Sequence, residues 1–138
     1  MEVDFSFVAD KAEAVNGKVY VLGGAFDTIW TTKVPVTHFL LSFVMRLLLS
    51  PAEIGRAHKI EINLIDEDGK RLASVGGDIT VGRESNLPSG WRQGFLTVLN
   101  FANLKFERFG DYSFEIVVNN SSMKTVPLRI AQRVQLSS

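Results

Sequence analysis

The stretch ERFGDYSFEIVV, residues 107–118, decides the fold class. From Tyr112 to Val118 every second residue is apolar, and Ser113 and Glu115 stand between them. Because successive side chains of a strand point to opposite faces, this pattern predicts a strand with one buried face. A Gly-Asp pair just before Tyr112 is similar to the tyrosine corner of Greek-key sandwiches, in which the tyrosine hydroxyl binds a preceding loop.

The same alternation occurs near the N-terminus, in Val3, Phe5 and Phe7, and again in the run from Ile60 to Leu64. Turn residues such as Asn-Gly, Asp-Gly and Asn-Asn separate the apolar runs. The sequence therefore predicts about eight strands, at residues 3–9, 18–29, 39–49, 58–65, 71–81, 93–102, 111–118 and 123–133. We expect an all-β fold, a single antiparallel β-sandwich of immunoglobulin-like or C2-like type that forms one domain over residues 1–138.

One short helical turn is expected at residues 50–54. Ser50 can cap it, Pro51 suits the first helical position, and Glu53 stands three residues after the cap, as in a capping box.

Strand 39–49 is apolar on both faces. Its odd positions from Phe39 to Leu49 form one face, and its even positions include Leu40, Val44 and Leu48. Strand 93–102 has the same character, with Phe95, Leu99 and Phe101 on one face and Leu96 and Val98 on the other. A strand that is apolar on both faces needs cover on both, which a loop or a second subunit can supply. Leu40, Val44 and Leu48 are therefore candidate partner-binding residues.

The composition excludes several classes of protein. Lys plus Arg and Asp plus Glu both number 15, and no basic run occurs, so nucleic-acid binding is not expected. The chain has no cysteine, which excludes disulfides and thiolate chemistry and fits a reducing compartment. The first residues lack the charge pattern of a signal peptide, and the most apolar run, 39–49, is too short for a membrane helix. We expect a soluble, cytoplasmic protein.

Most of the chain resembles a family of small bacterial domains of unknown function. The resemblance rests on VLGGAFDTIW, SPAEIGRAHKIEINLIDEDGKRL, LKFERFGDYSFEIVVNN and VPLRI, and spans residues 3–130. It implies an all-β sandwich and supplies no catalytic residue. The loop GRESNLPSGW and the tail AQRVQLSS lie outside it.

The acidic stretch Asp66-Glu67-Asp68-Gly69 raises the question of a calcium site. An EF-hand loop requires a different ligand spacing and two flanking helices, so that interpretation fails. We expect a hairpin turn in which Asp68-Gly69 supplies the positive φ. The alternative is a sandwich module that binds calcium or carbohydrate at the end formed by loops 27–38, 66–70 and 103–110, with Asp66, Asp68 and Asp111 as candidate metal ligands.

No catalytic group is expected. The two histidines, His38 and His58, fall at opposite ends of the predicted sandwich, and no G-x-S-x-G nucleophile elbow occurs. A hydrolase would require His38 beside a carboxylate in a closed pocket. We expect no enzyme activity and no cofactor.

Trp30 and Trp91 each stand at the end of a strand or a polar loop. Either ring could anchor a partner, or it could plug an open end of the sandwich. Taken together, the sequence predicts a non-enzymatic binding or assembly module with a protein partner, and a homodimer is one form that this assembly could take.

Overall fold

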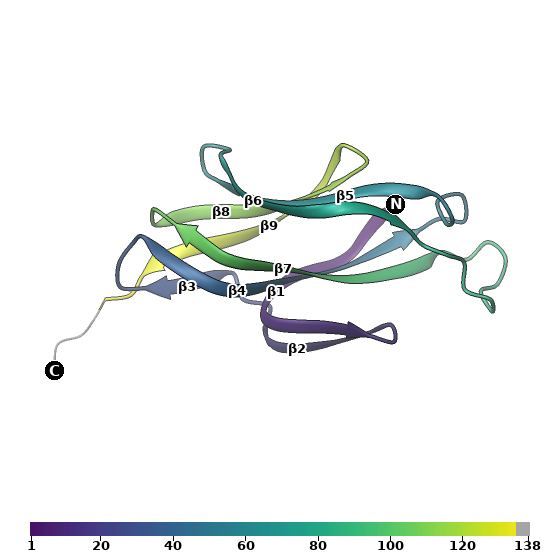
Figure 1. Ribbon diagram of the computed structural model, residues 1–138, viewed down its shortest axis with the longest axis horizontal. Coiled ribbons are helices and arrows are strands. Elements are labelled where there is room, and N and C mark those ends of the chain that lie inside the picture. Colours follow the sequence, from purple (N-terminus) through teal and green to yellow (C-terminus); the bar gives the residue numbers. More distant parts are fainter. Residues whose placement is uncertain (135–138) are drawn as a thin grey trace.

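Nine strands, arranged as two sheets that pack face to face, make up the computed structural model over the residues that it describes, 1–134 (Figure 1). The first sheet has the order β2–β1–β4–β7, and its strands are β1 (Glu2–Val15), β2 (Lys18–Gly24), β4 (Val36–Leu49) and β7 (Gln93–Phe106). The second has the order β3–β9–β8–β5–β6, and its strands are β3 (Thr28–Thr31), β5 (Ala57–Asp66), β6 (Arg71–Thr80), β8 (Gly110–Val118) and β9 (Ser121–Gln132). The predicted all-β sandwich is confirmed. The last four residues of the predicted domain, 135–138, lie outside the described residues.

Within residues 1–134, no helix offers the length and apolar character that crossing a membrane requires.

The main core lies between the two sheets. Its β4 side is formed by alternate residues from Leu41 to Leu49, as the sequence predicts. The facing side chains come mainly from β5 and β8, where the predicted alternation also holds: Ile60, Ile62, Leu64, Phe114, Ile116 and Val118. Phe39 is an exception, because its side chain is 76% exposed. The register passes from His38↔Leu104 to Leu40↔Ala102, so Phe39 has no partner across the ladder and turns away from the core.

The strand predicted at residues 18–29 is in fact two strands. Gly23 and Ala25 have positive φ angles of 64° and 63°, which end β2 and send the chain to the other sheet. Glycine suits position 23, because L side chains rarely adopt a φ of +64°. β3 then pairs in parallel with β9. The prediction of a purely antiparallel sandwich is wrong at this one pair of strands.

The N-terminal alternation also contains an irregularity. The register of β1 against β4 shifts between Val3 and Phe5. Val3 therefore packs against the main core, whereas Phe5 and Phe7 lie on the outer face of the first sheet beside Val44. The prediction that Val3, Phe5 and Phe7 share one face is wrong, because an extra residue in a strand reverses the faces that follow it.

A second, smaller core covers the outer face of the first sheet. Beyond Ala9, β1 separates from β4 and forms a hairpin with β2, which we call the arm (residues 10–24). Ala12 is buried in this cluster with Val44, and Val19 packs against it, as do Leu96 and Val98 of β7. The prediction that both faces of strands 39–49 and 93–102 are covered is thus confirmed for these residues, and the cover comes from the chain itself.

A polar contact holds the arm to β4. The Ala12 N–H donates to Ser42 Oγ at 3.2 Å, and Ser42 Oγ donates to Asn100 Oδ1 at 2.7 Å. Ser42 is fully buried, so this chain of hydrogen bonds satisfies a polar side chain within an apolar cluster.

The predicted tyrosine corner is present. The Tyr112 hydroxyl donates to the Arg108 carbonyl oxygen at 2.8 Å, and the ring of Tyr112 meets Phe106 edge-on, with 5.0 Å between the ring centroids. The bond ties the β7–β8 connection to the start of β8.

The predicted short turn at residues 50–54 is present as one hydrogen-bonded turn. The Ser50 carbonyl accepts from the Glu53 N–H at 2.9 Å, and Glu53 Oε1 accepts from the Ser50 N–H at 2.9 Å. Gly55, with φ +84°, then donates its N–H to the Val81 carbonyl, which directs the chain toward β5. The second oxygen of Glu53 binds the Met1 ammonium at 2.7 Å.

Replacing Tyr112 with Phe removes one partly buried hydrogen bond and leaves the ring in place. We expect Tyr112→Phe to lower the free energy of unfolding by about 1 kcal/mol, measured by urea denaturation. Tyr20→Phe is the matched control, because Tyr20 is 60% exposed, and it should leave stability unchanged. Equal losses in both variants would contradict the structural role of the Tyr112 hydroxyl.

The contact between Glu53 and Met1 predicts a pH effect. The hydrogen bond from the Met1 ammonium, reinforced by the Ser50 N–H and opposed by burial, lowers the pKa of Glu53 from 4.5 to about 2. A depressed carboxyl pKa contributes stability that is fully present above about pH 4.5 and is lost as the pH falls toward about 2. Glu53→Gln should therefore destabilise the protein by about 1–3 kcal/mol near neutral pH. The difference from wild type should shrink as the pH falls through this window, whereas a constant difference would refute the assignment.

Candidate functional site

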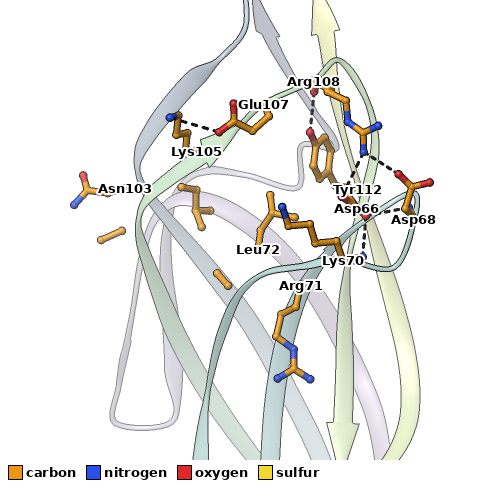
Figure 2. Close-up of a pocket in the computed structure, with 13 residues that line it drawn as sticks. Asp66, Asp68, Lys70, Arg71, Leu72, Asn103, Lys105, Glu107, Arg108 and Tyr112 are labelled. Carbon is orange, nitrogen blue, oxygen red and sulfur yellow. Dashed lines mark hydrogen bonds and ion pairs between the residues drawn. The ribbon is translucent and has the colours of Figure 1, made fainter.

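Two features could serve a function: a cleft on the open side of the sandwich, and the arm. The cleft has a volume of about 580 Å³ and lies where the first residues of β6 face the last residues of β7 (Figure 2). These are edge strands of the two sheets, so no further strand closes that side. The β5–β6 turn and the β7–β8 connection border the cleft, and its lining residues include Asp66, Asp68, Lys70, Leu72, Leu104 and Arg108.

Arg108 neutralises two of the predicted metal ligands. Its Nη2 lies 3.0 Å from Asp68 Oδ2 and 3.5 Å from Asp66 Oδ2, as the dashed lines of Figure 2 show. Asp68, by its hydrogen bond and charge, raises the pKa of Arg108, and Asp66 adds to the effect. Asp66 Oδ1 accepts from the backbone N–H groups of Asp68 (2.9 Å) and Lys70 (2.8 Å). Asp66 therefore shapes the turn, as aspartates in such turns commonly do.

The third predicted ligand, Asp111, has another partner. Its Oδ1 accepts from Arg129 Nε at 3.0 Å across the β8–β9 ladder, and this contact raises the pKa of Arg129. Its backbone N–H donates to Glu67 Oε1 at 2.8 Å. Asp111 and Asp66 both border a small depression of about 70 Å³. Even so, no group of three or more His, Asp or Glu side chains within residues 1–134 is arranged to hold a metal ion.

The stretch DEDG is a hairpin turn, as predicted. Gly69 has φ +80° and donates its N–H to the Asp66 carbonyl at 3.1 Å. The cleft beside this turn also lacks an exposed aromatic ring on which a sugar could stack, because the ring that borders it, Tyr112, is buried.

The two histidines lie on β4 and β5. His58 is buried, and its Nε2 donates to the Glu53 carbonyl at 2.8 Å while its Nδ1 accepts from Asn119 Nδ2 at 3.0 Å. These contacts give His58 a structural place between two loops. His38 is half-buried and does not line the cleft.

The predicted partner-binding residues do not form one surface. Trp30 on β3 and Trp91 in the loop after β6 are 57% and 62% exposed, so neither ring plugs an end of the sandwich. Figure 1 places β3 and that loop at opposite ends of the molecule. Leu40 is 42% exposed, Leu48 is half-buried, and Val44 is fully buried beneath the arm and unavailable to a partner. A role for the exposed residues as contacts stays a prediction.

The arm exposes apolar residues that the sequence prediction missed. Tyr20 is 60% exposed and Leu22 is 68% exposed, and Val15 and Val21 are also exposed. β2 ends the strand order of the first sheet, so its outer edge carries unpaired backbone groups. In Figure 1 the arm stands off the body of the sandwich, with β2 at the lower margin. The sequence does carry a signal for this exposed surface, because residues 19–22 are apolar on both faces, as strand 39–49 is.

Two charged residues flank the exposed side chains. The β1–β2 register pairs Tyr20 with Glu13 and Leu22 with Lys11. Because directly opposite residues share one face of an antiparallel ladder, these four side chains lie on the same face of the arm. They line a shallow depression of about 370 Å³. Ala12 and Val19 belong to the other face, which packs on the body.

A family model described as a family of unknown function (DUF6941) matches residues 4–131, and the chain belongs to this family. The match covers almost the whole span of the resemblance found in the sequence and confirms the resemblance to a family of unknown function. No curated protein and no solved structure matches the chain.

The engagement of Asp66, Asp68 and Asp111 predicts that calcium has no stabilising effect. A ligand that binds only the folded state raises the melting temperature. We expect the thermal midpoint to be the same with about 5 mM CaCl₂ as with EDTA. An increase of several degrees that is lost in Asp68→Asn would overturn this expectation and restore the calcium alternative.

Proposed function

We propose that this family member is a non-enzymatic protein-binding or assembly module, and that it binds a protein strand along the free edge of β2. The observation that carries the proposal is the pair Tyr20 and Leu22, which are more than half exposed beside an unpaired strand edge. Strand addition of this kind takes affinity from backbone hydrogen bonds and specificity from alternate side chains.

The edge of β2 has little of the usual protection against such pairing. Exposed edges are commonly blunted by charged residues or proline. Lys18, the first residue of β2, is its one charged residue, and residues 19–24 contain neither charge nor proline. The edge of β7 faces β6 across the cleft, whereas β2 in Figure 1 faces away from both sheets. An incoming strand can therefore reach β2 without displacing any part of the chain that the structure describes.

The side chains around the edge have the composition of a small interface. Tyrosine is enriched among residues that dominate binding energy, and a polar rim usually surrounds such residues. Lys11 and Glu13 supply that rim on the outward face of the arm. The proposed partner is a protein and neither a nucleic acid nor a membrane, in keeping with the equal numbers of acidic and basic residues. The proposed compartment is the cytoplasm.

A capture experiment with matched variants tests the proposal. The double variant Tyr20→Lys, Leu22→Lys places charge on the edge and should reduce recovery of the bound protein, or self-association, by at least about tenfold. Phe39→Lys is the control, because Phe39 is 76% exposed but lies on β4. Each tagged protein would be used to capture partners from lysate of the source cells, and binding would be repeated with the purified partner.

The proposal requires that capture fail for the arm variant and persist for the control, with both variants retaining the wild-type melting temperature. Equal recovery of the same proteins by the wild type and the arm variant, with unchanged self-association, would refute it.

A further inference from the structure

We infer that the strand bound by the arm is β2 of a second copy of this chain, antiparallel to the first and related to it by a twofold axis through Val21. The inference rests on the proposed function and specifies its partner. It would join two arms into one four-stranded sheet of order β1–β2–β2–β1, in which the exposed edge of each β2 is paired.

The register follows from the sequence of β2. In an antiparallel pair, directly opposite residues share a face. A twofold axis normal to the sheet must therefore set one residue opposite the same residue of the other copy, and it cannot fall between two successive residues. An axis through Val21 sets Tyr20 of each copy opposite Leu22 of the other. An aromatic side chain opposite an aliphatic one is a favourable cross-strand pair.

Neighbouring registers lose this complementarity. An axis through Tyr20 would set Leu22 opposite Lys18 of the second copy. An axis through Leu22 would set Tyr20 opposite Gly24, which has no side chain to contact the ring. Only the axis through Val21 pairs both exposed apolar side chains of each copy.

The charges on the arm are compatible with the same arrangement. Lys11 lies beside Leu22 and Glu13 beside Tyr20 in the β1–β2 ladder. Across the four strands, one row on the outward face therefore reads Lys11, Leu22, Tyr20 and Glu13, and the next row reads the reverse. The two tyrosines and two leucines form a central apolar block, and a Lys11–Glu13 pair borders it on each side. Like charges directly opposite one another would destabilise a sheet, and this arrangement contains none across the axis.

The ends of the ladder are also set by the chain. In the inferred register Val19 lies opposite Gly23 of the second copy, and Gly23 has φ +64°, outside the strand region. Pairing should therefore extend over residues 19–23 and stop there. So short a ladder buries less surface than a standard protein interface, which predicts a weak dimer that depends on concentration.

Single cysteines test the register directly, since the chain has no cysteine of its own. Directly opposite residues have Cα atoms about 4.5–5.5 Å apart, within reach of a disulfide, whereas diagonal neighbours are too distant. Under mild oxidation Val21→Cys should cross-link to itself. Tyr20→Cys mixed with Leu22→Cys should give mixed dimers several times more readily than either variant alone. Phe39→Cys, on β4, measures the rate of cross-linking by random collision.

Preferential self-cross-linking of Tyr20→Cys or Leu22→Cys would overturn the register. Cross-linking of Val21→Cys no faster than that of Phe39→Cys would overturn pairing through β2.

Sedimentation velocity separates failure of this inference from failure of the proposed function. The wild type should pass from monomer to dimer between about 5 and about 500 µM, and the double variant Tyr20→Lys, Leu22→Lys should remain monomeric over that range. A wild type that stays monomeric throughout overturns the second copy as partner. The proposed function would still stand if a different protein were captured in a manner that depends on Tyr20 and Leu22.

Discussion

The rest of the structure depends on one requirement, that β4 be covered on both faces. β4 lies in the interior of the first sheet, and its alternate residues from Leu41 to Leu49 fill the core between the sheets. On its other face Val44 must also leave water, because burying an aliphatic side chain is worth about 1.5–3 kcal/mol. With the second sheet committed to the main core, the cover comes from the arm. β1 accordingly pairs with β4 only as far as Ala9 and then leaves it.

Covering β4 with the arm leaves the outer edge of β2 unpaired. A two-stranded hairpin is marginally stable in isolation, so the arm relies on Ala12 and Val19 against the outer face and on the hydrogen bond to Ser42. Only one face of the arm can be used in this way. The side chains of the other face, Tyr20 and Leu22 among them, remain in water together with the outer edge of β2. The element that completes the fold thus leaves exposed apolar side chains beside an unpaired strand edge.

Strand faces that follow a regular alternation could be predicted from the sequence, whereas local reversals that depend on a single residue could not. Alternation identified β5, β8 and the inner face of β4, and the Gly-Asp pair before Tyr112 predicted that its hydroxyl binds the preceding loop, where the structure shows Arg108 as the acceptor. A single extra residue near Val3 and an unpaired Phe39 reversed local faces without changing the composition of either strand. For the candidate site, the need for cover over Val44 was correct, but only the structure shows that the chain meets this need itself.

The contrast between the acidic loop end and the arm explains why we propose binding at the arm. At the loop end, a single guanidinium bridges Asp66 and Asp68, Arg129 holds Asp111, and backbone N–H groups occupy the remaining oxygen of Asp66. A cation placed there would have to displace these partners, and it would leave Arg108 without its counter-ions. At the arm, the proposed partner strand would displace only water and would gain both backbone hydrogen bonds and apolar contact. The balance of costs therefore favours association along β2 over capture of an ion among the loops.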